Sequence, residues 1–435
     1  MITPTIRFVC HGCGAIVDAA LALPFRCPHA GAAGDDIDHL LVPVNGYAEE
    51  FTAANDFGPA ENPFLRYRRL LSPYRLARKA NLSDAAWEDI VGRLDDALIV
   101  VDGGGFRVTP MAVQPALGQS IGIEGTLWVK DETGNVSGSH KARHLMGAML
   151  YLRVLKAAHL PAGERIEARR LAIASCGNAA LAAAVIARAA EWPLDVFIPS
   201  DASPEVVARL KDLGARITVC ERDPAQAGDP CFRRFREAVS AGAIPFGVQG
   251  SENGLAIEGG RTLAFEMAET FRSARQTPDA VFVQVGGGAL ASALAQGFAM
   301  AANIGIIARA PRLVVVQSAG CAPLDRAWKL MEKTEVNVAA HHRGRFMWPW
   351  ESVPASVAHG ILDDETYDWV EIVRSMRLSG GNSLVVNEET LIRAHELACS
   401  QTGIRVSATG TAGLAGLLAA PFKGQAAVIF SGVER

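Results

Sequence analysis

Lys141 stands in a context that suits an amine with a chemical task. It follows the Gly-Ser turn of Gly138 and Ser139 and precedes an apolar helical pattern. Ser139 would cap this helix, and unpaired backbone N–H groups of the first turn would surround the lysine. The positive end of the helix dipole lowers the pKa of an amine, which suits a nucleophile or a Schiff base. The alternative is a surface lysine in the first turn.

A glycine run follows a β-rich run further along the chain. Residues 281–285 are β-rich, Gly286, Gly287 and Gly288 come next, and a helical pattern begins at Ala289. Backbone N–H groups in such a loop can close on a phosphate at the helix N-terminus. The run lacks the G-x-G-x-x-G dinucleotide pattern and no Gly-Lys-Ser/Thr follows it. A single terminal phosphate therefore fits better than a dinucleotide or a Walker-type site.

A polar turn joins another expected strand to another expected helix. It consists of Ser175, Cys176, Gly177 and Asn178. Open α/β sheets bind ligands at the carboxyl ends of their parallel strands, and helix-start N–H groups there would hold a carboxylate. The alternative is an ordinary strand-to-helix turn capped by serine and asparagine.

The elements that would position these residues alternate between strands and helices. Strands are expected at 171–175, 196–199, 217–220, 245–249, 281–285, 313–317 and 427–430. Helical patterns such as 181–190 and 258–271 separate most of them, and 83–101 also has helical spacing. The alternation predicts parallel sheets covered by helices. The irregular segment 341–379 is expected to form a lid or substrate-facing loops.

In combination, these motifs resemble the fold-type-II pyridoxal-phosphate enzymes, and most of all threonine synthase. The resemblance runs from about Thr109 to the C-terminus and includes stretches at 258–266, 314–324 and 387–418. It implies an α/β fold with two parallel-sheet, helix-covered domains. The large cofactor-binding domain would comprise 41–145 and 250–435, the smaller domain 146–249, and a zinc-ribbon-like module 1–40.

The resemblance also assigns roles to single residues. Lys141 would carry pyridoxal phosphate as a Schiff base and move the Cα proton, and Asn178 would bind the phenolic oxygen of the cofactor. Thr409 would meet its ring nitrogen, with Ser407 as the alternative. A neutral hydroxyl there leaves the ring nitrogen largely unprotonated, which favours elimination over transamination. The phosphate would lie on Gly286, Gly287, Gly288 and Ala289, and the substrate on Ser175, Cys176, Gly177, Asn178 and Arg143.

Departures from the threonine synthase pattern affect the expected reaction. The lysine motif reads Gly-Ser-His-Lys-Ala-Arg-His where that family has Gly-Ser-Phe-Lys-Asp-Arg-Gly. His140 would contact the phosphate or pack against a neighbouring helix. We therefore expect a lyase that eliminates a β- or γ-substituent from a small hydroxy- or O-substituted amino acid. Alternatives are threonine synthase, with Arg143 at a second phosphate site, and a non-catalytic cofactor-binding subunit.

Three of the eight cysteines cluster near the N-terminus. Cys10, Cys13 and Cys27 resemble the zinc-ribbon-like start of many threonine synthases, but Ala30 replaces the fourth cysteine. Tetrahedral zinc needs a fourth ligand. His29 is our choice, with His11 and His39 as alternatives. The metal-free alternative is a degenerate ribbon kept for packing or for subunit contacts.

Composition excludes several other classes. The 435 residues are 49% hydrophobic and 20% charged, with a net charge of −4 and no basic run, so nucleic acid is not an expected partner. Charge-free apolar stretches are too short to span a bilayer, and the N-terminus lacks the apolar region of a signal peptide. We expect a cytoplasmic protein with a small amino acid as substrate. Resemblance alone implies a homodimer.

Overall fold

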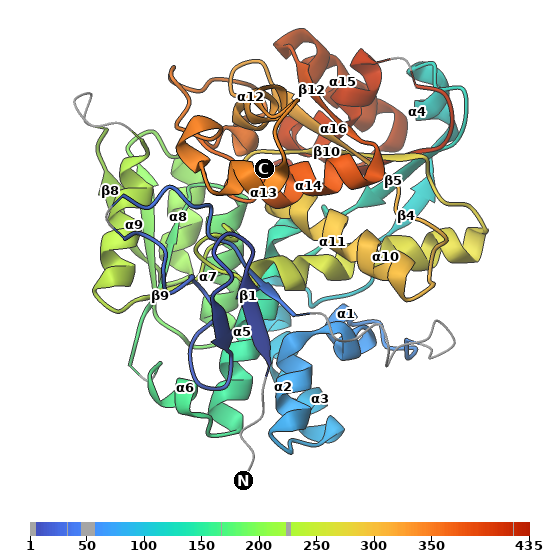
Figure 1. The fold of residues 1–435 in the computed structure, drawn as a ribbon. Helices are drawn as coiled ribbons and strands as arrows, with labels where there is room; N and C mark the ends of the chain where they lie inside the picture. The colour runs from blue at the N-terminus through green and yellow to red at the C-terminus, as the bar shows by residue number, and fades with distance from the viewer. Residues whose placement is uncertain (1–5, 33, 45–56, 167, 223–227, 421) are drawn as a thin grey trace.

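The computed structural model describes residues 6–32, 34–44, 57–166, 168–222, 228–420 and 422–435. Three sheets organise this part of the chain. They have the strand orders β2-β1-β3, β12-β11-β10-β13-β5-β4 and β8-β7-β6-β9. Figure 1 shows the four-stranded sheet in green on one side, the six-stranded sheet on the other, and the N-terminal strands in dark blue near the middle of the view.

The six-stranded sheet is parallel except for β4, which pairs antiparallel with β5. Its strands are β4 (Met111–Val113), β5 (Leu127–Asp131), β10 (Ala280–Gln284), β11 (Arg312–Ser318), β12 (Asn382–Val386) and β13 (Ala426–Phe430). The helices of this part are α4 (Pro115–Ser120), α10 (Ala256–Ala274), α11 (Ala289–Asn303), α12 (Pro323–Leu330), α13 (Val336–Ala340), η3 (Arg343–Arg345), η4 (His359–Ile361), α14 (Trp369–Ser379), α15 (Glu388–Thr402) and α16 (Ala408–Ala419).

Helices cover both faces of this sheet. Successive side chains of a strand point to opposite faces, so each strand contributes to a core on either side. In β10, Val281 and Val283 enter a core shared with α10, α11 and α14. Ala280 and Phe282 enter a second core shared with α15 and α16. The central strands β10 and β13 are therefore buried along their whole length, as is typical of a parallel sheet covered by helices on both sides.

The four-stranded sheet is wholly parallel, and its strands lie within the segment 146–249 expected for the smaller domain. They are β6 (Leu171–Ala174), β7 (Leu194–Pro199), β8 (Arg216–Cys220) and β9 (Ile244–Pro245). The surrounding helices are η2 (Val136–Gly138), α5 (Lys141–Ala157), α6 (Pro161–Glu164), α7 (Asn178–Ala189), α8 (Pro204–Asp212) and α9 (Pro230–Ser240). The strand expected at 245–249 is shorter than predicted, and β12 was not anticipated.

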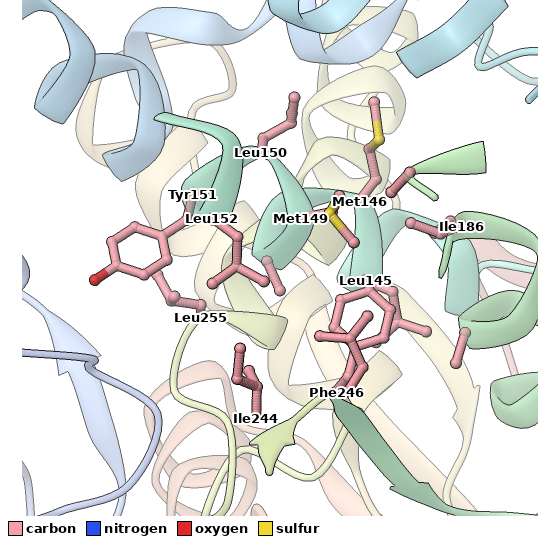
Figure 2. Close-up of a cluster of buried hydrophobic side chains, with 14 of the residues drawn as sticks. Leu145, Met146, Met149, Leu150, Tyr151, Leu152, Ile186, Ile244, Phe246 and Leu255 are labelled. Atoms are coloured by element: carbon pink, nitrogen blue, oxygen red, sulfur yellow. The ribbon is translucent and has the colours of Figure 1, made fainter. Parts of the chain in front are cut away.

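Helix α5 is apolar on nearly all sides because it packs against both α7 and α10. Figure 2 shows Leu145, Met146 and Met149 in the same core as Ile186 of α7 and Phe246, which follows β9. These side chains are fully buried. A helix anchored on all sides holds its first residue, Lys141, in a fixed place.

The N-terminal part forms an antiparallel sheet and several helices. The strands are β1 (Arg7–Cys10), β2 (Ile16–Asp18) and β3 (Leu41–Pro43), and the helices are α1 (Pro63–Arg66), η1 (Arg68–Leu70), α2 (Ser72–Lys79) and α3 (Asp84–Asp102). The side chain of Ser83 caps α3 by accepting the N–H of Ala86, which agrees with the helical spacing predicted at 83–101. None of the helices in the described ranges has the length and apolar character needed to cross a membrane.

Candidate active site

Lys141 is the first residue of α5, at the place where the sequence predicted the helix to begin. The cap residue is His140 rather than Ser139, whose extended backbone precedes the cap and whose hydroxyl makes no capping bond. Burial lowers the pKa of Lys141, and the nearby carboxylates of Asp363 and Asp368 oppose this effect without cancelling it. The amine makes no hydrogen bond or ion pair with any residue in the described ranges. It is therefore available for chemistry.

His140 pairs with a residue that the sequence analysis did not single out, Ser431. The Nδ1 atom of His140 lies 2.6 Å from Ser431 Oγ, and this oxygen also accepts the backbone N–H of His140 at 3.1 Å. Burial holds the pKa of His140 well below its ordinary value, so the imidazole is neutral. Ser431 directly follows β13, a fully buried strand. A polar residue at the carboxyl end of a buried parallel strand was the signal that could have identified it.

The predicted glycine loop lies between β10 and α11. Gly288 caps α11 with φ 101°, a left-handed conformation that favours glycine, and Ala289 begins the helix. A Cβ on Gly286 would collide with Asp363 and with the backbone of Ile361. The first N–H groups of α11 have no partner within the helix. The loop therefore offers backbone donors in a space that tolerates no side chain.

Part of the irregular segment 341–379 lies directly on this loop. Asp363 Oδ2 accepts the N–H of Gly287 at 2.7 Å. Thr366 Oγ1 donates to Gly286 O at 2.9 Å, and the N–H of Tyr367 donates to Gly287 O at 2.9 Å. An internal carboxylate thus occupies an anion position on the loop. Burial raises the pKa of Asp363, while Lys141 and the Gly287 N–H lower it.

The polar turn Ser175 to Asn178 follows β6, as predicted. Ser175 Oγ accepts the N–H of Gly177 at 3.4 Å, and Asn178 is the first residue of α7. Asn178 Oδ1 accepts a hydrogen bond from Arg435 Nη1 at 2.6 Å. Burial raises the pKa of the Cys176 thiol, and Asp201, Asp229 and Asp363 raise it further. This turn therefore lies in acidic surroundings.

The two hydroxyl candidates for the ring nitrogen have different neighbours. Ser407 caps α16, since its Oγ accepts the N–H of Gly410 at 3.3 Å. Thr409 Oγ1 accepts the N–H of Gly360 at 3.0 Å. A Cβ on Gly432 would lie 2.7 Å from Asn178 Nδ2 and 3.1 Å from Ser407 Oγ. The absence of a side chain at Gly432 therefore lets the side chains of Asn178 and Ser407 both approach the backbone of Gly432, which follows Ser431.

Arg143 lies in a different environment from the one expected. Its guanidinium is fully buried and donates to Glu132 at 2.8 Å, to Glu266 at 2.6 Å and to the hydroxyls of Thr109 and Thr262. Lys130 joins the cluster through Glu266 at 2.6 Å. The carboxylates raise the pKa of Arg143 above its already high value. These contacts overturn the expectation that Arg143 binds substrate, because its donors are committed to an internal ion-pair network.

The N-terminal cluster also differs from the expectation in one residue. The structure brings the ligand atoms of Cys10, Cys13, Cys27 and His39 within 4.8 Å of one another. His29, the expected fourth member, is exposed, and its Nδ1 atom lies 3.5 Å from Cys13 Sγ without joining this group of four. His39 is nearer because the chain returns to β1 through β3, which begins two residues later.

The residues around Lys141 suit pyridoxal phosphate. The glycine loop already binds a carboxylate through a backbone N–H, as a phosphate site requires. Ser139 Oγ, His140 Nε2 and Asp368 Oδ1 are buried and have no hydrogen-bond partner among the described residues. The first two belong to the two residues that precede Lys141 in the chain, and the third belongs to a carboxyl group that affects the pKa of Lys141. An amine, anion-binding N–H groups and free polar atoms are the groups that this cofactor needs.

Comparisons with known proteins also indicate a pyridoxal-phosphate site. A family described as "Pyridoxal-phosphate dependent enzyme" matches residues 103–432. Threonine synthase of Mycobacterium bovis is 27% identical over 339 residues, which cover 77% of this chain and 81% of that protein.

Solved structures show the same fold at lower identity. Maize serine racemase has a TM-score of 0.58 and 18% identity, covering 79% of this chain and 93% of that one. Threonine deaminase isoform 2 of Solanum lycopersicum has a TM-score of 0.57 and 15% identity, covering 81% of this chain and 91% of that one. The predicted fold-type-II architecture is confirmed, and the chain belongs to the pyridoxal-phosphate-dependent enzymes.

Proposed function

We propose that this chain is a lyase that eliminates a β- or γ-substituent from a small hydroxy- or O-substituted amino acid. The observation that carries the proposal is the amine of the half-buried Lys141, which has no partner among the described residues and whose pKa is lowered by its surroundings. An amine with a lowered pKa can accept a proton near neutral pH. When bound, pyridoxal phosphate supplies the electron sink for bond breaking at the substrate Cα.

Each residue of the site would have one task in this reaction. Lys141 would hold the cofactor covalently, then take the Cα proton and return it to the departing group or to solvent. Gly286, Gly287, Gly288 and Ala289 would bind the phosphate through backbone N–H groups. Asn178 would orient the cofactor, and the N–H groups of the turn that begins at Ser175 would receive the substrate carboxylate. A neutral hydroxyl, from Thr409, Ser407 or Ser431, would face the ring nitrogen and favour elimination.

Threonine synthase is the second candidate, and relatives of that name support it. Its substrate, O-phosphohomoserine, carries a phosphate that needs a binding site of its own. Arg143 was the residue expected to bind this phosphate, but its guanidinium forms ion pairs with Glu132 and Glu266. This observation favours elimination from a substrate without a second phosphate. A cofactor-binding subunit without turnover is the third candidate, and the free amine of Lys141 argues against it.

A substrate panel distinguishes these functions. The purified protein, loaded with pyridoxal phosphate, is incubated separately with L-serine, L-threonine, O-phosphoserine and O-phosphohomoserine. We expect keto acid and ammonia from L-serine or L-threonine, which carry no second phosphate. Threonine and inorganic phosphate from O-phosphohomoserine would establish threonine synthase instead. A spectral change without any product would identify a non-catalytic binding subunit.

We also propose a cytoplasmic homodimer, as the resemblance implies. Multi-angle light scattering of the loaded protein would give twice the 46.1 kDa chain mass. A monomer with full activity would exclude any need for a second copy.

A further inference from the structure

Four side chains from separate parts of the N-terminal module meet at one point. Cys10 ends β1 and Cys13 lies in the turn that follows, while Cys27 and His39 come from the chain between β2 and β3. Cys10 Sγ lies 3.4 Å from His39 Nδ1, and Cys13 Sγ lies 3.5 Å from Cys27 Sγ. Three sulfur atoms and one imidazole nitrogen therefore lie within 4.8 Å of one another.

We propose that Cys10, Cys13, Cys27 and His39 bind one zinc ion. Zinc bonds of about 2.3 Å to sulfur and about 2.0 Å to nitrogen place tetrahedral ligands roughly 3.5–3.8 Å apart. The two observed separations are close to this range. Three of the four side chains are buried, and a set of three thiols and one imidazole suits zinc better than a hard cation. The site is closed by four protein ligands, so its role is structural.

The far side of His39 supports a ligand role. Its Nε2 atom lies 3.2 Å from Asp35 Oδ1, while Nδ1 faces the thiols. Histidines that bind metals usually donate their second ring N–H to a carboxylate, which fixes the tautomer and the ring orientation. His29 has no such arrangement among the described residues, since it is exposed and its Nδ1 atom reaches only Cys13. The sequence Asp35 to His39 therefore supplies both a ligand and its support.

The proposed zinc site also connects to the segment that covers the glycine loop. The N–H of Asp38, next to His39, donates to Ala340 O at 2.7 Å, and Asp38 Oδ1 accepts Trp369 Nε1 at 3.0 Å. Ala340 and Trp369 lie on either side of the stretch 341–368, which contains Asp363 and covers the glycine loop. Fixing His39 on the metal would hold Asp38 in place and, through it, both ends of this segment.

Metal content tests the ligand set. The full-length protein, purified without chelator or affinity metal, should contain about one zinc per chain by elemental analysis. His39→Ala and Cys27→Ser should lose the metal, and His29→Ala, the matched control, should keep it. Asp35→Ala should keep the ligands but bind zinc about 10- to 100-fold more weakly. Retention of zinc by His39→Ala with loss in His29→Ala would overturn the assignment.

A second measurement applies even if the variants do not fold. Cobalt exchanged into the wild-type protein should give the absorption bands of a tetrahedral site with thiolate ligands. A wild-type protein that takes up neither zinc nor cobalt, or that contains a Cys13–Cys27 disulfide, would refute the site.

Hydrogen exchange tests the connection to the active site. Removing zinc with a chelator should speed exchange in 36–44 and 368–374 and leave β6 and β7 unchanged. Unchanged exchange at 368–374 would overturn the connection to the glycine loop. None of these readouts depends on catalytic activity, so failure of this proposal is separable from failure of the proposed lyase function.

Discussion

Replacing Asp363 with alanine should strengthen binding of pyridoxal phosphate. The Asp363 carboxylate accepts the N–H of Gly287 at 2.7 Å, and the cofactor phosphate is expected to use the same loop. Two anions cannot share one small site without a cost, so the carboxylate must leave or take up a proton when the phosphate binds. Removing it removes the competitor.

The size of the effect follows from the hydrogen bond that is lost. A bond to a charged acceptor contributes about 1.5–3 kcal/mol, and each 1.4 kcal/mol corresponds to about tenfold in affinity. The expected gain is therefore about 10- to 100-fold in Kd. It should be largest at high pH, because the pKa of Asp363 is raised by burial and the protonated carboxyl competes less. Lowering the pH should bring the wild type closer to the variant.

The assay is a titration of the cofactor-free protein with pyridoxal phosphate in buffer without phosphate, followed by the visible band. Asp364→Ala is the matched control, because it removes a neighbouring charge whose partner is Arg222 and not the glycine loop. Asp363→Asn keeps the shape and removes only the charge. Equal or weaker affinity of Asp363→Ala, compared with wild type and Asp364→Ala, would refute competition at the loop.

Three further changes test other parts of the structure. Lys141→Ala should abolish the visible band and all turnover, while Lys156→Ala on the same helix should keep both; a band that survives in Lys141→Ala would rule out this lysine as the anchor. Arg143→Met should lower the free energy of unfolding by about 3–5 kcal/mol in urea titrations, because it leaves buried carboxylates without their partner. Arg93→Met, at an exposed pair, should cost less than about 1 kcal/mol, and similar losses for both arginines would contradict the buried network. Burial raises the pKa of Asp368 to about 8, so between about pH 4 and pH 8 the native state binds more protons than the unfolded state and stability falls as pH rises. Asp368→Asn should flatten that part of the pH–stability profile. A profile identical to that of the wild type would show that the pKa of this carboxyl is not raised in the native state.

Local signals predicted the places where elements begin. The glycine and serine before Lys141, the glycine run before Ala289 and the capping side chain of Ser83 each lie within a few residues of the helix that they start. Capping and backbone conformation depend on neighbours along the chain, so a single sequence reveals them. The error over Ser139 was a shift of one residue within the same turn.

Partners distant in sequence were not predictable in this way. Arg143 was expected to bind substrate because it belongs to the Lys141 motif shared with the resembled family. A helix turns by about 100° per residue, however, so the two side chains leave α5 in different directions. Only the packing of α10 beside α5 brings Glu266 to that guanidinium. The structure favours His39 over His29 for a similar reason, since β3 pairs with β1 and returns the chain to Cys10.

The sequence by itself therefore determined the alternation of strands and helices, and the resemblance of its motifs to a known family indicated the cofactor and the residue expected to carry it. Periodicity and short motifs can both be recognised from the order of residues along the chain. Tertiary structure decided which side chains face one another across the site. The pairing of His140 with Ser431, 291 residues away, and the contact of Asp363 with Gly287 arise only after two sheets and a covering segment pack together. Their energies depend on burial, which no local pattern specifies.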